Sequence, residues 1–280
     1  MNKISLWQGP MTIAFYTWRE GMRKKALVGF LILSLMVIFG SSFMTAFLGD
    51  MRSAGDIETD VEAKMIKDIC VSAISVFGIL ITIFISASVV PAEMENKVIY
   101  TVLSKPIRRF QYLLGKFIGV QMIIIINLAL MSALFFVALY LRQDVLPTLL
   151  LWSALLTYFQ FLIVSSFTFA ISCTSTSSVL PTIAGLFIFI TGNMTEYLKD
   201  VKERAGDTGS ALNEAIGQIA NGLYYILPNL RSFDLRTQIL YLQPNDPPAD
   251  VQIPNLIALG LVYALVGYAL AFLFFHRREL

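Results

Sequence analysis

Long apolar runs constrain the fold of this chain more than any other feature of its sequence. Of its 280 residues, 56% are hydrophobic and only 14% are charged, whereas a soluble domain normally carries about 25% charged residues. The deficit comes from stretches of about 20 apolar residues, the length of a helix that crosses a ~30 Å hydrocarbon layer. Because lipid cannot satisfy open backbone groups, these stretches must be helices. The sequence therefore predicts an all-α, polytopic membrane protein.

The apolar stretches predict one transmembrane domain that covers residues 1–280. We expect six membrane spans, at residues 26–48, 69–90, 117–140, 149–173, 179–198 and 255–275. An even number of spans places both termini on the same side. The first stretch is too long for the apolar part of a cleavable signal peptide, and no small-residue cleavage site follows it.

The charges of the loops predict the orientation. The loops on one side carry 12 Lys or Arg and 4 Asp or Glu residues, and those on the other side carry 9 and 15. The basic set is 1–25, 91–116, 174–178 and 276–280, and the acidic set is 49–68, 141–148 and 196–254. Because Lys and Arg gather in short cytoplasmic loops, we expect both termini in the cytoplasm.

The N-terminal segment 1–25 predicts an amphipathic helix that lies flat in the cytoplasmic interface. Its apolar stripe at helical spacing consists of Met11, Phe15, Trp18 and Met22. Arg19 and Arg23 fall on another face, and Glu20 stands four residues before Lys24, a favourable spacing on a helix. The alternative is a plain basic segment that only fixes the topology.

The loop 91–116 is longer than a connection between two spans requires. Pro91 closes the second span, and residues 92–102 read as a short helix with Glu93 four residues before Lys97. Proline disfavours helix at the residue before it, so Lys105-Pro106 breaks this helix. The loop is either a rigid elbow that transmits a push from a soluble motor or a positively charged connector, and the residues alone favour neither.

Three motifs in this loop, in a fixed order, resemble the signature of type-2 ABC transporter permeases. They are Glu93-x-Glu95, Thr101-x-Leu103-Ser104-Lys105-Pro106-Ile107-x-Arg109 and Tyr112-Leu113-Leu114-Gly115-Lys116. The upstream run Thr17-x-Arg19-Glu20-x-x-Arg23-Lys24-Lys25 resembles the interface helix of that family. Leu227-Pro228-Asn229 with Phe233-Asp234 resembles its multicopper-enzyme-maturation and gliding-motility branch.

The resemblance implies a half-transporter of the bacterial cytoplasmic (inner) membrane. Two such permeases, identical or different, would pair, and two separate ATPase subunits would dock below them. The segment 91–106 would act as the coupling helix, with contacts from Glu93, Glu95, Ser104, Lys105 and Pro106. Trp18, Arg19, Glu20 and Arg23 would belong to the interface helix. The substrate pathway would pass Phe77, Phe84, Phe187 and Asn193.

The sequence offers no chemistry of its own for hydrolysing ATP. It contains no G-x-x-x-x-G-K-[ST] run, the loop that cradles phosphates in many ATPases. Its single histidine, His276, makes neither a metal site nor a catalytic triad, and its basic residues form no stripe for nucleic acid. We therefore expect a non-catalytic subunit without a cofactor.

The remaining polar features of the spans predict packing. Cys70 and Cys173 fall near opposite predicted membrane borders, so we expect both to be free and buried. No charged residue lies centrally in a span, which argues against an ion-coupled transporter. For the amides of Asn127, Gln160 and Asn193 we expect interhelical hydrogen bonds.

The external loop 199–254 is too long for a simple connector. An apolar pattern at helical spacing runs through Leu212, Ile216, Ile219, Leu223 and Ile226. The resemblance implies that the loop caps the exit of the pathway. The alternative is that it packs on the spans without a gating role, and it could meet a periplasmic protein. Three functions stay open: an exporter permease, a mechanotransmitter that moves a periplasmic partner, and a membrane scaffold.

Overall fold

Every regular element in the described part of the chain is a helix. The computed structural model describes residues 8–51, 59–96, 108–143, 148–195, 228–234 and 253–278. The elements are α1 (Gln8–Gly21), α2 (Lys25–Met51), α3 (Thr59–Ser88), α4 (Pro91–Glu95), α6 (Arg109–Gln143), α7 (Thr148–Ser172), α8 (Val179–Asn193), the 3-10 turn η1 (Arg231–Phe233) and α12 (Ile253–His276). The prediction of an all-α protein is confirmed.

Four helical stretches are long and apolar enough to cross a membrane. They are Asp68–Glu95, Arg109–Val137, Leu151–Ser172 and Ile253–His276. A fifth candidate, Lys25–Ser41 in α2, qualifies only together with Gly9–Gly21 in α1, from which it is bent by 65°. α8 has 15 residues and is about 22 Å long, shorter than the hydrocarbon layer. The structure confirms a multi-pass helical protein, and the count of six spans stays a prediction.

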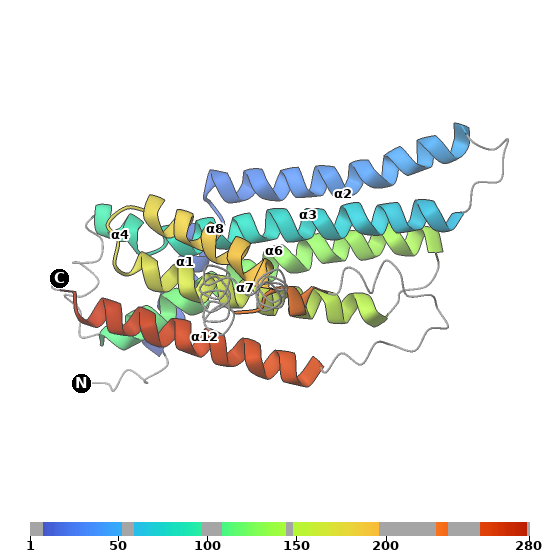
Figure 1. The fold of residues 1–280 in the computed structure, drawn as a ribbon. Coiled ribbons are helices and arrows are strands. Elements are labelled where there is room, and N and C mark those ends of the chain that lie inside the picture. The colour runs from blue at the N-terminus through green and yellow to red at the C-terminus, as the bar shows by residue number, and fades with distance from the viewer. Residues whose placement is uncertain are drawn as a thin grey trace, which may run out of the picture.

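The long helices run side by side in one bundle (Figure 1). α12 packs on α7, α2 packs on α3, and α3 also contacts α6, α7 and α8. The core between them is apolar, with Ile81, Ile123, Phe161 and Phe169 almost fully buried. α4, the end of α12 and the start of α8 lie at the same end of the bundle (Figure 1), here called the α4 end.

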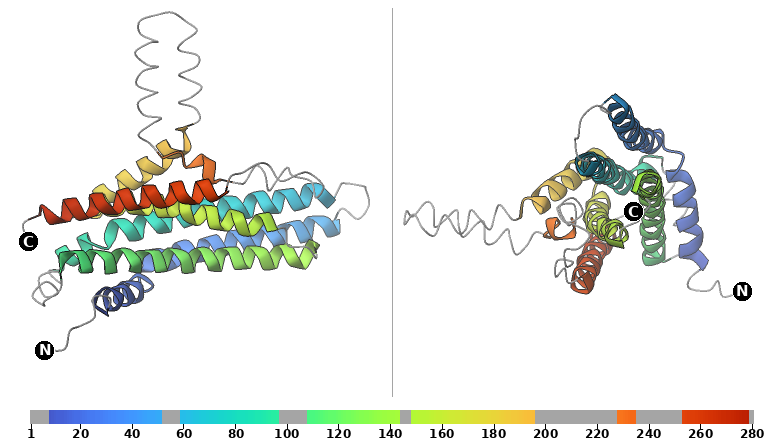
Figure 2. Two further views of the ribbon diagram at one scale, coloured as in Figure 1. Left: turned by 90° about the horizontal axis from the view of Figure 1, so that it is seen from below. Right: turned by 90° about the vertical axis from the view of Figure 1, so that its right-hand side faces the viewer.

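α1 lies crosswise to the bundle and packs mainly on α6 (Figure 2). Two glycines of α6 make the close approach possible. A Cβ atom added to Gly115 would lie 2.6 Å from the backbone oxygen of Pro10, and one added to Gly119 would lie 2.6 Å from the Cβ of Thr17. Any larger residue at these positions would push α1 away from the bundle.

Only half of the apolar stripe predicted for α1 faces the protein. Ala14 and Thr17 are the buried side of the helix, while Met11 and Phe15 are 61% and 51% exposed. Trp18 and Met22 are partly buried against the core. α1 thus approaches α6 closely through small residues, and its Met11 and Phe15 side chains face outward.

Several Ser and Thr hydroxyl groups inside the bundle donate within their own helices. Thr82 donates to the carbonyl oxygen of Gly78 at 2.8 Å, and Ser86 donates to that of Thr82 at 2.7 Å. Such bonds to the preceding turn let Ser and Thr sit in a helix interior. An apolar environment requires them, because it supplies no other partner.

Both cysteines are free and buried, as predicted. Cys70 lies on α3, where its Sγ is 3.3 Å from the Oγ of Ser41 on α2. Cys173 directly follows α7.

The predicted loop 91–116 is shorter in the structure than in the sequence analysis. α4 ends at Glu95, and α6 begins at Arg109, so the last part of the predicted loop is helical. Residues 97–107 lie outside the described part of the chain, as do Lys97 and the predicted helix end at 102.

Candidate functional site

A buried carboxylate at the α4 end fastens α4 to α6. α4 follows α3 after two residues and has a proline at its first turn, where a missing N–H costs nothing. This turn directs Glu93 inward, where it is buried. Its carboxylate accepts hydrogen bonds from the hydroxyl of Tyr112 and from the Nζ of Lys116, both on α6.

The groups around this carboxylate extend the contact to α12. Tyr112 is fully buried and stacks on Phe275 of α12, with ring centroids 5.7 Å apart and planes at 23°. The Nζ of Lys116 also lies 6.0 Å from the centroid of the Tyr112 ring. Glu93, Tyr112, Lys116 and Phe275 form one cluster, which we call the elbow lock.

Beside the elbow lock, two arginine side chains donate hydrogen bonds to carbonyl oxygens at or just beyond the ends of other helices. Nη1 of Arg109 donates to the backbone oxygens of His276 at 3.3 Å and Arg278 at 3.2 Å. Nη1 of Arg278 donates to the backbone oxygens of Cys173 at 3.0 Å and Ser175 at 3.2 Å. Carbonyls at a helix C-terminus lack partners within the helix, and cations there are favourable. The ends of α6, α7 and α12 are thereby held together close to α4.

In the elbow lock, the buried charges of Glu93 and Lys116 depend on each other for neutralisation. A buried ion pair contributes little net stability, but removing one partner leaves an uncompensated charge that costs about 3–5 kcal/mol. The ion pair of Glu93 with Lys116 thus opposes a separation of α4 from α6. A displacement of α4 would pull directly on α6.

The other predicted coupling residues lie in different surroundings. Glu95 is exposed at the end of α4, two residues beyond the buried Glu93. Ser104, Lys105 and Pro106 lie outside the described residues. The structure therefore separates the two carboxylates predicted to act together: one is bound inside the chain and the other faces outward.

The predicted interface-helix residues lie on α1 or on the turn after it. Arg19, Glu20 and Arg23 are exposed, and Trp18 is half-buried. α1 ends at Gly21, so Glu20 and Lys24 do not share one continuous helix. The Nζ of Lys24 turns instead to the Oγ of Ser88 at the end of α3, at 2.8 Å.

The four predicted pathway residues are spread along two helices. Phe77 packs against the core, whereas Phe84 and Phe187 are 40% and 65% exposed. Asn193, at the far end of α8, accepts a hydrogen bond from the amide of Gln160 at 3.4 Å. Of the four, Phe84 alone lines the cavity described next.

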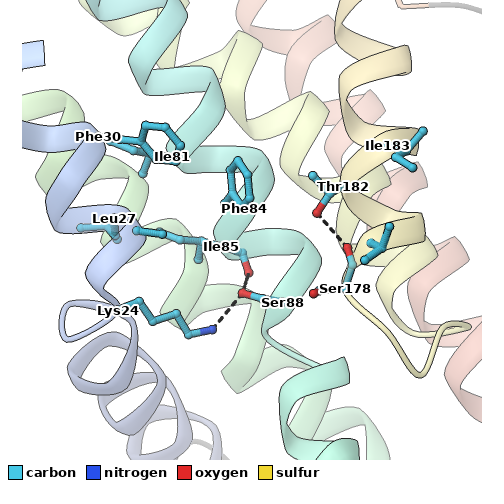
Figure 3. A pocket seen from close by; sticks show the side chains of 12 residues that line it. Lys24, Leu27, Phe30, Ile81, Phe84, Ile85, Ser88, Ser178, Thr182 and Ile183 are labelled. Atoms are coloured by element: carbon cyan, nitrogen blue, oxygen red, sulfur yellow. Dashed lines mark hydrogen bonds between the residues drawn. The ribbon is translucent and has the colours of Figure 1, made fainter. Parts of the chain in front are cut away.

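A cavity of about 350 Å³ lies between α2, α3 and α8 (Figure 3). Its lining contains Lys24, Phe30, Phe84, Ser88 and Thr182. The sequence did not predict this cavity. The available signal was Lys24 itself, a cation directly before an apolar span, which the charge count treated as one of many topology signals.

A second polar cluster fastens the described segment 228–234, which lies in the predicted external loop, to α7 and α8. The N–H of Leu230 donates to the oxygen of Gly192 at 3.0 Å, and the hydroxyl of Thr195 donates to Oδ1 of Asn229 at 3.0 Å. The amide of Gln160 reaches the oxygen of Leu230 at 3.4 Å. The predicted interhelical roles of Gln160 and Asn193 are seen here, while Asn127 donates within its own helix.

The fold defines a class of protein, a multi-pass helical membrane protein, and in it a short helix that ends in an exposed carboxylate is bonded to a membrane helix. The family description "ABC-2 family transporter protein" matches residues 11–280, and the chain belongs to this family. No curated protein gives a match. Membership makes the chain a membrane permease component that associates with an ABC ATPase. Among the described residues, no three His, Cys, Asp or Glu side chains gather as metal ligands.

Proposed function

We propose that this chain is the permease subunit of an ABC exporter, which pairs with a second permease and is driven by two separate ATPase subunits. The observation that carries the proposal is the elbow lock, because it joins a short helix that ends in the exposed Glu95 to a membrane helix through a buried ion pair. A connector that only obeyed the topology rule would need no such bond. In this proposal the α4 end faces the cytoplasm, as the loop charges predict.

The two carboxylates of α4 take different roles. Glu95 is exposed and is suited to contact a groove of the ATPase, together with Ser104, Lys105 and Pro106. Glu93 is buried against Tyr112 and Lys116, so its role is to pass the displacement of α4 to α6. ATP binding would close the motor and move α4, and α6 would follow.

α1 is placed to lie in the cytoplasmic interface of the membrane. It runs crosswise to the bundle (Figure 2), its Met11 and Phe15 are exposed, and Arg19 and Arg23 are exposed cations. Helices of this kind bury their apolar face at the boundary between headgroups and acyl chains. Through its contact with α6, α1 would therefore anchor this end of the bundle at the membrane surface.

The substrate pathway is proposed along α3 and α8. Both helices contribute exposed aromatic residues, Phe84 and Phe187, and they contact each other in the bundle. Asn193 lies beside the hydrogen bonds that hold the external segment 228–234. Substrate would pass Phe84 first and Asn193 last.

A photo-crosslinking amino acid at position 95 tests the proposed docking contact. In native membranes, irradiation should join the chain to an ATPase subunit. The same group at position 266, on the outward face of α12 where Val266 is 46% exposed, is the control and should capture no ATPase. Capture at both positions, or at neither, would contradict docking through α4.

A mechanotransmitter is the second candidate, and one observation favours it. The external segment is bonded to α8 and its end through Gly192 and Thr195, so a movement of α8 would also move this segment. ATP hydrolysis that rises with a soluble external protein, in the absence of any transported molecule, would select this function over export.

A further inference from the structure

The cavity between α2, α3 and α8 is divided into an apolar part and a polar end (Figure 3). Its apolar walls are Leu27, Phe30, Ile81, Phe84, Ile85, Val179 and Ile183. Its polar side chains are those of Lys24, Ser88, Ser178 and Thr182. All four come from the ends of their helices that face the α4 end. A ligand that fits this lining needs a polar head and an apolar body.

The polar end carries a positive charge that the described residues do not pair. The Nζ of Lys24 has a hydrogen bond to Ser88, but in the described part of the chain the one ion pair is that of Lys116 with Glu93. Burial lowers the pKa of Lys24, with Lys116 acting in the same direction and Glu20 and Glu93 opposing them. An anion in the cavity would offset this desolvation, because a buried charge requires a partner.

The polar end also has hydroxyl groups that can donate hydrogen bonds to an oxygen-rich group. Ser178 precedes α8, and its side chain makes no capping bond to that helix. The hydroxyl of Ser88 accepts from Lys24 and donates to the oxygen of Ile85 at 3.3 Å, a long bond that an oxygen acceptor could replace. Charge-assisted bonds to such a group are the strong ones.

The cavity opens sideways, where a bilayer would lie. Val179 and Ile183 are 63% and 60% exposed, and Phe84 is 40% exposed. From Ser88 to Ile81 the wall of α3 spans about 10 Å along the helix. The charged group thus lies at one end of the bundle, at the height of a headgroup, and the apolar walls continue toward the membrane interior.

We infer that this cavity binds an amphiphile of the cytoplasmic leaflet whose headgroup carries a phosphate and a net negative charge. Lys24 holds the phosphate, the hydroxyls of Ser88 and Ser178 add hydrogen bonds, and the chain lies along Phe30 and Phe84. A cationic headgroup is repelled by Lys24, and an uncharged one leaves its charge unpaired. The choice of leaflet rests on the orientation proposed above, whereas the binding does not depend on ATP-driven export.

Native mass spectrometry of the purified full chain tests the inference. The chain is extracted from vesicles of equal parts phosphatidylglycerol and phosphatidylcholine with identical acyl chains, and the retained lipids are counted. The native chain should retain phosphatidylglycerol preferentially. Lys24→Gln should lower this preference about tenfold, the loss of one charge-assisted hydrogen bond, and Lys24→Arg should keep it.

Two further variants make the result specific. Lys25 is the next residue, its side chain is exposed, and it does not line the cavity. Lys25→Gln therefore removes the same charge outside the site and should keep the preference. Ile183→Trp should fill the cavity and lower retention of both lipids. Glycerol 3-phosphate at millimolar concentration should displace neither lipid, because it lacks an apolar body.

Three outcomes would overturn the inference. Lys24→Gln could retain phosphatidylglycerol as the native chain does. Glycerol phosphate could displace the lipid, which would indicate a site for soluble anions. Ile183→Trp could split a dimer without changing the retained lipid, which would assign this face to a second copy. No ATPase is present in these measurements, so failure of ATPase docking and failure of lipid binding remain distinguishable.

Discussion

Lys116 has a role in the structure that its position in the sequence does not indicate. In the sequence it closes a basic loop and counts as a topology signal. In the structure it is 3% exposed and neutralises Glu93, 23 positions earlier in the chain. Tyr112 and Lys116 are four residues apart and therefore share a helix face. That spacing was available in the sequence, but the partner of this face was not.

The elbow lock makes a specific prediction for stability at the residue scale. Glu93→Gln leaves Lys116 buried without a counter-charge, so the free energy of unfolding should fall by about 3–5 kcal/mol. Adding Lys116→Met removes that charge, while the introduced amide oxygen can still accept from Tyr112, so the double variant should recover most of the loss. Thermal unfolding of the detergent-solubilised protein measures both. Equal melting temperatures for Glu93→Gln and the native chain would show that the pair is not mutually dependent.

At the scale of elements, the position of α1 depends on its close packing against α6. The sequence predicted a helix there, and the structure has one over Gln8–Gly21. The apolar pattern could not tell which face binds protein, because lipid and a protein core both accept Met and Phe. The small residues of α6 determine which face of α1 binds protein, because α1 leaves no room for a side chain at Gly115 or Gly119.

A glycine pair tests this contact. In Gly119→Ala the new Cβ would lie 2.8 Å from the backbone oxygen of Ala14, which cannot rotate away, so overpacking should cost about 1–3 kcal/mol. Gly29→Ala on α2 meets nothing within 4 Å and should be neutral or stabilising by up to about 1 kcal/mol. Chemical denaturation of both variants measures the difference. If both behave alike, α1 is not held by close packing.

The spans were predictable to different degrees for a physical reason. Apolar length alone located α3, α6, α7 and α12, because each is long enough to cross a bilayer by itself. The stretch 179–198 is also apolar, but α8 ends at Asn193, and Leu230 of the segment 228–234 packs against Gly192. Composition cannot reveal such a contact from a segment much further along the chain.

At the scale of the whole molecule, the residues that we propose for coupling lie at one end of the bundle. The exposed Glu95, the buried elbow lock and the arginine bonds of Arg109 and Arg278 all lie near α4. The sequence predicted which segment carries these features. It could not separate Glu95 from Glu93, since burial depends on α6 and α12.

The measurement that tests the central claim most directly is recovery of the ATPase with the solubilised chain from its native membrane. An ATPase should copurify with the native chain and with Glu20→Lys, which changes an exposed carboxylate on α1. Glu95→Lys should reduce its recovery at least about tenfold, since a reversed charge opposes the docking contact. The account would be contradicted if Glu95→Lys recovered as much ATPase as the native chain, or if no ATPase copurified in any of several mild detergents.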